Sequence, residues 1–306
     1  MRRRTAIALV ERLSSRVAWY ARRTGGRARL RLRDALTSAG ARLQPERLVL
    51  DCASGAEASG LFSEVAAVVG CLAHYEARPE LYAGLRVDFQ EHGLYYDPAA
   101  GANWWEYYFE PVTIASSRKA IDRIVPPWQH DDFAEYVELD MPRDVAAGIV
   151  KRHVRIRESM RNQVDRYWVA HADGAGMIGI HYRGTDKWEG APPVPYEAVA
   201  AAVREASVAV GDAHCKIFVA TDEQAFLDYM LTAYPGQVVY RQMPRSVDGH
   251  PIHKAPGDGF RKGEDAVIDC LLLARCAQLV RTDSDLGLFA TFFNPDLPVR
   301  LLGTPL

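Results

Sequence analysis

Residues 177–187 read Met-Ile-Gly-Ile-His-Tyr-Arg-Gly-Thr-Asp-Lys, an apolar run that leads directly into polar side chains. Strands of a parallel sheet that is covered on both faces are apolar along their length. Met177 to Ile180 therefore predicts a buried strand, and His181 to Lys187 predicts the loop that follows it. Open α/β sheets bind ligands outside the carboxyl ends of their strands. The loop is thus a candidate binding site, and Gly184 lets the backbone approach a ligand closely.

Two further apolar runs end in a similar way. Residues 216–220 precede Thr221-Asp222-Glu223, and residues 277–280 precede Arg281-Thr282-Asp283-Ser284-Asp285. A single Arg and Asp at one strand end would be an ordinary surface ion pair. Three strands that each open into Thr-Asp favour one shared site, because right-handed crossovers bring parallel strand ends to the same edge.

Strand-like and helix-like segments alternate from Gly176 onward, which predicts an α/β fold with a doubly wound parallel sheet. The expected helices are 196–210, 223–233, 263–278 and 286–293. A further strand is expected at 237–240. The first half predicts strands at 47–50 and 85–89, a helix at 62–75, and one or two bridging helices within 144–170. We therefore expect an N-terminal α/β domain at 36–171 and a Rossmann-like domain at 172–306.

The segment 93–109 is rich in aromatic side chains with amides and carboxylates between them. Two interpretations remain open from the sequence. Aromatic rings can stack on the C–H faces of a sugar, but core packing is the commoner role of aromatic residues.

Charge is distributed unevenly along the chain. Residues 1–50 hold thirteen arginines against three acidic residues, a formal charge of +10, so the rest of a chain of net charge −2 carries −12. The leader at 1–35 predicts a basic amphipathic helix that packs on the protein or lies on an anionic membrane surface; nucleic acid is disfavoured as a partner. No stretch approaches the length of a spanning helix. The five scattered cysteines indicate buried thiols in a reducing compartment, so we expect a cytoplasmic protein. Association of the leader with the inner membrane face stays open.

Four motifs carry a resemblance to a known family. They are His-x-Arg-x-Thr-Asp-Lys from His181, Ala-Thr-Asp-Glu from Ala220, Ile268-Asp269 within a helix, and Leu-Val-x-Thr-x-Ser from Leu279. Together they resemble the α-1,6-fucosyltransferases, which include bacterial nodulation enzymes and the enzyme that core-fucosylates N-glycans. The resemblance implies a GT-B-like fold with two Rossmann-like domains facing a cleft. It also implies metal-independent transfer of fucose from GDP-fucose to a glycan hydroxyl, with inversion.

Donor chemistry suggests roles for the polar residues. Negative charge builds on the diphosphate as the glycosidic bond breaks, and the planar fork of Arg183 suits phosphate oxygens. The resemblance places Ser284 on phosphate, Asp269 on the guanine N–H groups, and Asp222 on the phosphate loop or the ribose. It further implies that His181, Thr282 and Gly55 border the donor. Without a ligand, Asp269 would instead pair with Arg275 or Lys262.

The general base is expected shortly after the Asp-Lys pair, where the resemblance implies Glu189, with Lys187 as its neighbour and Asp186 as the second candidate. The chain departs from the core-fucosylating enzymes in having Arg183-Gly184 instead of two adjacent arginines. Lys254, Arg261 or Lys262 are the candidate replacements for the second cation.

Other readings of the function also remain open. His250 and His253 have the spacing of a weak zinc motif without a third ligand nearby, and we expect no metal. The acceptor would be a glycan or a lipid-linked oligosaccharide. The alternatives are a glycosyltransferase that uses another nucleotide sugar, and a nucleotide- or glycan-binding protein without turnover.

Overall fold

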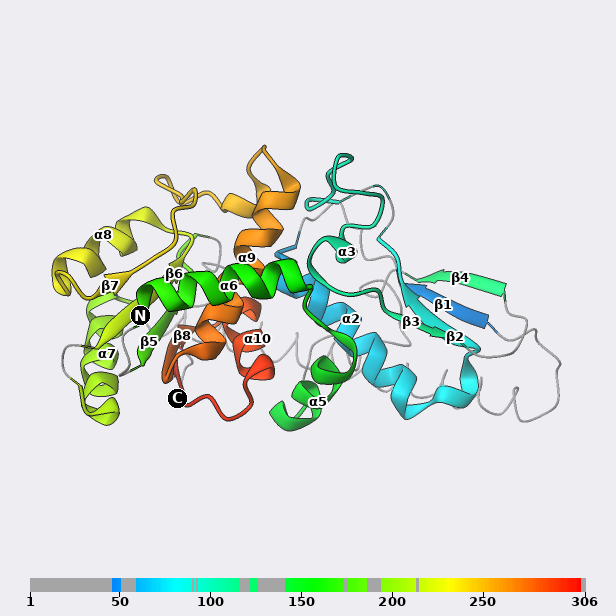
Figure 1. Ribbon diagram of the computed structural model, residues 1–306, viewed down its shortest axis with the longest axis horizontal. Coiled ribbons are helices and arrows are strands. Elements are labelled where there is room, and N and C mark those ends of the chain that lie inside the picture. Colours follow the sequence, from blue (N-terminus) through cyan, green and yellow to red (C-terminus); the bar gives the residue numbers. More distant parts are fainter. Residues whose placement is uncertain are drawn as a thin grey trace, which may run out of the picture.

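The computed structural model describes residues 46–50, 59–89, 91, 93–115, 121–125, 141–172, 176–185, 194–212 and 215–303. The basic leader expected at 1–35 lies outside these residues. The molecule is elongated, with one sheet toward each end and helices α2 (Leu61–Ala77), α9 (Gly259–Arg275) and α10 (Asp285–Phe293) between them (Figure 1). No helix of the described part is long and apolar enough to cross a membrane.

The C-terminal sheet is parallel throughout its described strands, in the order β7-β6-β5-β8-β9. Its strands are β5 (Met177–Tyr182), β6 (Lys216–Thr221), β7 (Val238–Val239), β8 (Gln278–Thr282) and β9 (Val299–Leu302). The strand order reverses between β5 and β8, which is the switch point where such sheets open a crevice for ligands. The predicted doubly wound sheet is confirmed.

Helices cover both faces of this sheet because successive strand residues point to opposite sides. Ile178 and Ile180 pack with α7 (Tyr196–Val210) and α8 (Gln224–Ala233) in one apolar cluster. Met177 and Leu279 belong to a second cluster, which contains the buried side chains of α9 and α10. Gly179 faces the same side, where a Cβ would come within 3.0 Å of the Cys276 sulfur. Close contact between α9 and the central strand thus depends on this glycine.

The central strand is longer than the sequence predicted. His181 and Tyr182 continue β5, and His181 pairs in register with Ala220 of β6 and Arg281 of β8. The prediction that the polar loop begins at His181 is therefore wrong by two residues. The reason is that pairing with β6 and β8 satisfies the backbone amide and carbonyl of His181, so the strand continues although its polar side chain is only 5% exposed.

The N-terminal sheet has the order β3-β2-β1-β4. Its strands are β1 (Glu46–Leu50), β2 (Gly84–Val87), β3 (Thr113–Ala115) and β4 (Ile121–Val125), and β3 is antiparallel to its neighbour. Helix α2 and the short helix η1 (Pro79–Leu81) lead from β1 to β2. The start of α2 points toward the C-terminal half and contributes to the site described below.

Two helices, not one, bridge the halves: α5 (Arg143–His153) and α6 (Glu158–His171). They separate where Ile156 forms a bridge with Phe109 and the Arg157 amide donates to the Tyr108 carbonyl. Arg143 donates to the carbonyls of Thr291, Asn294 and Leu297 at the end of α10. Because α5 packs on α10 and α6 packs on α9, the halves share one core, and the domain division at residue 172 stays a prediction.

The aromatic segment belongs to this shared core. Trp104, Trp105, Tyr108 and Phe109 are at most 2% exposed, and α3 (Trp105–Tyr108) packs against α9. The Tyr108 hydroxyl donates to the Phe260 carbonyl at 2.9 Å, and a Cβ on Gly263 would lie 2.2 Å from that hydroxyl. Core packing, rather than sugar stacking, is therefore the role of these four rings.

Candidate functional site

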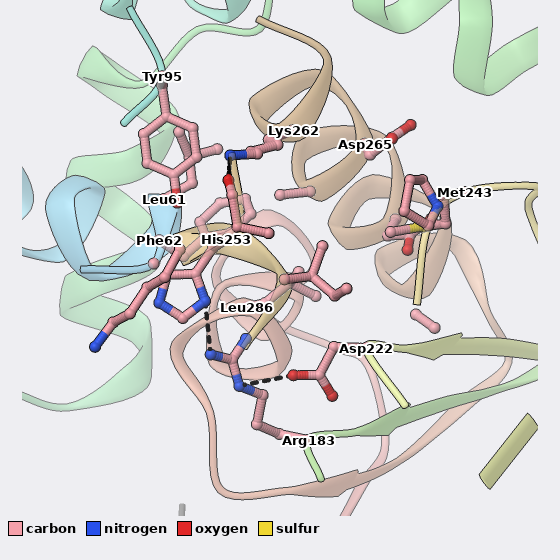
Figure 2. Close-up of a pocket in the computed structure, with 18 of the residues that line it drawn as sticks. Leu61, Phe62, Tyr95, Arg183, Asp222, Met243, His253, Lys262, Asp265 and Leu286 are labelled. Atoms are coloured by element: carbon pink, nitrogen blue, oxygen red, sulfur yellow. Dashed lines mark hydrogen bonds and ion pairs between the residues drawn. The ribbon is translucent and has the colours of Figure 1, made fainter. Parts of the chain in front are cut away.

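A pocket of about 470 Å³ lies at the carboxyl edge of the C-terminal sheet. Its walls come from the ends of β5 and β6, residues 243–244, the segment 252–258 with its short helix η3 (Ile252–Lys254), the first half of α9 and the start of α10. The N-terminal half adds the start of α2 and Tyr95 (Figure 2). The lining includes the following residues with functional groups: Ser59, Ser63, Tyr95, His181, Arg183, Asp222, His253, Lys254, Asp258, Arg261, Lys262, Asp265, Asp269, Ser284 and Asp285.

Arg183 follows the last residue of β5 and extends into this pocket (Figure 2). Its Nε lies 3.1 Å from Oδ2 of Asp222, and its Nη2 lies 3.1 Å from Nδ1 of His253. Since a guanidinium only donates, His253 Nδ1 is unprotonated in this contact. The Arg183 head group is thus held between β6 and η3, at the mouth of the switch point.

Asp222 orders the turn that carries Arg183. Its Oδ1 accepts from the amide of Gly184 at 3.1 Å, and its Oδ2 accepts from the Thr185 hydroxyl at 2.6 Å. A carboxylate that receives several donors fixes their positions. Asp222 therefore sets the geometry of the loop, and it also lines the pocket.

Thr282 ends β8 and sits behind the pocket wall, because it is not among the lining residues. Its hydroxyl accepts a hydrogen bond of 2.9 Å from the backbone amide of Arg183. Thr282 thus supports the Arg183 backbone, and its contact with the donor stays a prediction. The threonine at the end of one strand holds the residue at the end of its neighbour.

His181 lines the pocket from within β5 and is 5% exposed. Burial, and then the nearby Arg183 and Arg281, lower the His181 pKa to about 3, so the ring is neutral near pH 7. Its Nδ1 has no hydrogen-bond partner within the described chain and lies where a Cβ on Gly287 would come within 3.0 Å. The imidazole thus packs closely against the first turn of α10.

Ser284 is the residue before α10, in extended conformation, and it lines the pocket. Within the described part of the chain its hydroxyl makes no capping bond to the helix. The two neighbouring carboxylates differ: Asp283 has 78% of its side chain exposed and does not line the pocket, whereas Asp285 accepts from the Ser63 hydroxyl at 2.5 Å. The Asp283 carboxylate therefore points away from the pocket.

Asp269 reaches the pocket from α9 and is 4% exposed. Its partner is Arg241, whose Nη1 donates to Asp269 Oδ1 at 3.2 Å. The expected alternatives are wrong: Arg275 pairs with Asp165 on the surface, and the Lys262 ammonium donates to the Ala255 carbonyl. Burial raises the Asp269 pKa to about 6, while Arg241 acts in the opposite direction.

Three further cations line the pocket, namely Lys254, Arg261 and Lys262. At the position after Arg183 the chain has Gly184 instead of a second arginine. A Cβ on Gly184 would lie 2.1 Å from Glu223 Oε2, so the Glu223 carboxylate occupies the position that a larger residue needs. Arg261 already pairs with Glu264 at 2.6 Å, and its Nε is 3.5 Å from Asp265.

The histidines do not gather with other ligands. His253 contacts Arg183, while His250 lies 3.2 Å from Asp248 with 86% of its side chain exposed. Among the described residues, no three His, Cys, Asp or Glu side chains form a cluster suited to a metal ion. Four of the predicted site residues, Gly55, Asp186, Lys187 and Glu189, lie outside the residues that the structure describes.

Sequence reasoning missed Arg241 and Asp265, which hold Asp269 in place. The sequence contains one weak indication for each of these two residues. Arg241 follows the apolar run 238–240, as Arg183 follows β5. Asp265 precedes Asp269 by four residues, which puts both on one face of α9.

The family model described as Nodulation protein Z (NodZ) matches residues 143–295, which is half of the chain. The chain belongs to the NodZ family. The NodZ match spans α5 to the end of α10 and so contains Arg183, Asp222, Asp269 and Ser284. Comparison with curated proteins returns no match.

Solved structures share the fold. A NodZ α-1,6-fucosyltransferase soaked with GDP-fucose aligns with a TM-score of 0.56 and 19% identity, covering 82% of this chain and 93% of that one. Fucosyltransferase NodZ from Bradyrhizobium gives 0.52 and 16%, covering 85% and 95%. POFUT1 in complex with GDP gives 0.52 and 12%, covering 86% and 100%. The predicted GT-B-like class is thus confirmed, with two sheets arranged as in NodZ and POFUT1.

Proposed function

We propose that the protein is a glycosyltransferase that transfers fucose from GDP-fucose to a glycan hydroxyl, with inversion and without a metal ion. The observation that carries this proposal is that Arg183, Asp269 and Ser284, from three different elements, line one pocket. Membership of the NodZ family supports it, as do the fold relatives solved with GDP-fucose or GDP.

Each of the three residues binds a different part of the donor. Arg183 presents its guanidinium at the switch point, where it neutralises charge on the departing diphosphate. Ser284 offers its hydroxyl at the start of α10, whose free amides favour anions. Asp269 accepts the two adjacent N–H groups of guanine from the side of α9.

Two lysines in the pocket wall would neutralise the same negative charge of the diphosphate. Lys254 and Lys262 flank the diphosphate opposite Arg183 and take the place of the second arginine. His181, held neutral, packs beneath the donor without adding a proton that titrates near pH 7. Gly60 at the start of α2 lines the pocket, and Gly55 is proposed to border the donor.

Transfer also needs a base for the acceptor hydroxyl. Glu189 is the proposed base, with Lys187 as its neighbour and Asp186 as the second candidate. The three residues follow Thr185, which Asp222 anchors at the pocket edge. The acceptor is proposed to be a glycan or a lipid-linked oligosaccharide in the cytoplasm, with the basic leader in contact with the inner membrane face.

Nucleotide competition is the direct test. GDP should raise the melting temperature far more than UDP or dTDP at equal concentration, because a ligand stabilises in proportion to its affinity. A response to UDP instead would favour another nucleotide sugar. Tight GDP binding without hydrolysis or transfer from GDP-fucose, across a panel of glycans, would favour a binding protein without turnover.

A matched pair of variants locates the nucleotide. Arg183→Lys keeps the charge but loses the planar fork, so the GDP dissociation constant should rise roughly 10- to 100-fold. Arg275→Lys is the control, because Arg275 lies at the far end of α9 and pairs with the exposed Asp165. Equal affinities in the two variants would remove Arg183 from the donor site.

A further inference from the structure

We propose that Arg241 is a positioning residue for nucleobase selectivity: it orients the Asp269 carboxylate toward the pocket so that guanine is preferred over bases that lack its donor pair. This inference rests on the proposed function, since it concerns the same nucleotide. It assigns a role to a residue that does not itself line the pocket.

Arg241 lies two residues beyond β7 and is 8% exposed. Its Nη2 donates to Asp265 Oδ1 at 2.6 Å, and its Nη1 donates to the Asp265 carbonyl at 3.0 Å and to Asp269 Oδ1 at 3.2 Å. One guanidinium thus forms hydrogen bonds with Asp265 and Asp269, which lie on successive turns of α9. Such a fork leaves its carboxylate partner little rotational freedom.

The contact with Arg241 makes the two carboxylate oxygens of Asp269 inequivalent. Within the described chain, the hydrogen bond to Asp269 falls on Oδ1, so Oδ2 and the second lone pair of Oδ1 remain for the two N–H groups of a ligand in the pocket that Asp269 lines. A carboxylate fixed in this way is ready to accept N–H groups without first rotating, which lowers the entropic cost of binding. Arg241 therefore acts on the base through Asp269.

Charge around Asp269 supports the same role. The ionisable groups facing it are Arg241 and Arg245 from the segment after β7, Asp265 and Cys270 on its own helix, and Tyr167 of α6. Burial, with a smaller contribution from Asp265, raises the Asp269 pKa to about 6 in spite of the two arginines. Loss of Arg241 would move the pKa upward again, so that the carboxyl would be protonated, and a poor acceptor, near pH 7.

The test compares GDP with IDP, which lacks the exocyclic amino group of guanine, by calorimetry between pH 5.5 and 8.5. The wild type should bind GDP about tenfold more tightly than IDP at pH 7.5. In Arg241→Gln this preference should shrink toward unity at pH 7.5 and partly return at pH 8.5. Below the Asp269 pKa, selectivity should fall by up to tenfold per pH unit. The titration of the diphosphate is the same for both ligands and cancels in their ratio.

Two other variants sharpen the result. Asp265→Asn removes the neighbouring negative charge, so the pH midpoint of selectivity should move down, opposite to Arg241→Gln. Arg241→Lys keeps a positive charge and should retain part of the selectivity. It replaces Arg241→Gln as the test variant if the glutamine variant folds poorly. Arg275→Gln on the exposed side of α9 is the control and should leave the midpoint and the ratio unchanged.

The outcomes are distinguishable. If the wild type does not bind GDP, or binds GDP and IDP equally, then the guanine contact and the proposed donor fail together with this inference. If the wild type prefers GDP but the Arg241 variants keep the same ratio and midpoint, only the inference is overturned. Equal weakening of GDP and IDP with an unmoved midpoint also overturns it, because that is the result of a purely structural arginine.

Discussion

The hydroxyl of Thr282 accepts a hydrogen bond of 2.9 Å from the backbone amide of Arg183. This bond joins the carboxyl ends of β8 and β5 at the switch point, where the candidate donor pocket opens. The guanidinium of Arg183 is therefore placed by a neighbouring strand as well as by its own.

Replacing Thr282 with valine tests this placement, because valine has the same shape without the hydroxyl. The Arg183 amide would lose its partner, and we expect the free energy of unfolding to fall by about 1–3 kcal/mol. Urea denaturation measures the change. Thr282→Ser, which keeps the oxygen, should lose less; equal losses in the two variants would show that the methyl group, not the hydrogen bond, matters.

Asp222 is the second anchor of the same turn. In Asp222→Asn one oxygen becomes an NH₂ group, so either Gly184 or the Thr185–Arg183 side loses its acceptor. We expect GDP to bind roughly tenfold more weakly, as for the loss of one charge-assisted hydrogen bond, by calorimetry. Asp283→Asn, with a mostly exposed side chain outside the pocket, should leave the GDP affinity unchanged. A similar effect from both would contradict the anchoring role.

His181 should give a distinct pH signature. Its pKa in the folded protein is about 3, below the ordinary value of about 6.5, so the unfolded chain binds the proton more readily between these values. The stability contributed by the neutral ring is full above pH 6.5 and is lost as the pH falls toward 3. Asp269, with its raised pKa, has the opposite sign, so the comparison must be made between variants.

The measurement is the drop in urea midpoint between pH 7 and pH 5. It should be smaller in His181→Asn, which cannot take up the proton, than in the wild type. An identical drop in both proteins would mean that His181 titrates normally and is not shielded by β5 and α10.

Gly263 should not tolerate alanine. Alanine is the better helix former by about 1 kcal/mol, but its Cβ would meet the Tyr108 hydroxyl at 2.2 Å. Overpacking against a buried ring should win, for a net loss of about 1–3 kcal/mol by thermal or urea unfolding. Gly148→Ala in α5 is the matched control, because its Cβ would meet only the flexible end of Arg152 at 3.2 Å. Equal stability of the two variants would argue against close packing at Gly263.

The sequence predicted the C-terminal sheet well because its signals are local. Apolar runs that end in Arg183, Asp222 and Ser284 mark strand ends, and the fold then brings those ends to one edge. The helix spanning 196–210 was predicted at its observed bounds. Strands β3, β4 and β9 were not predicted, since they are short or lack a continuous apolar run.

The support of the site was harder to foresee. Arg241 and Asp269 are 28 residues apart and meet only because β7 ends beside α9. Several acidic residues of α9 and several arginines offered alternative pairs, and spacing alone favoured Arg275 or Lys262. The aromatic run was ambiguous for a related reason: whether Tyr108 stacks on a sugar or on a helix depends on what packs opposite it.

The shared core between the two sheets determines how the molecule comes apart. Tyr108 rests on the backbone of α9, and Arg143 binds the carbonyls that end α10. Heating should therefore give a single calorimetric transition whose enthalpy matches its van't Hoff value, instead of one melt for each sheet. By the same reasoning, cutting the chain at residue 172 would expose large apolar faces on both fragments. Neither fragment should then fold and bind a nucleotide on its own.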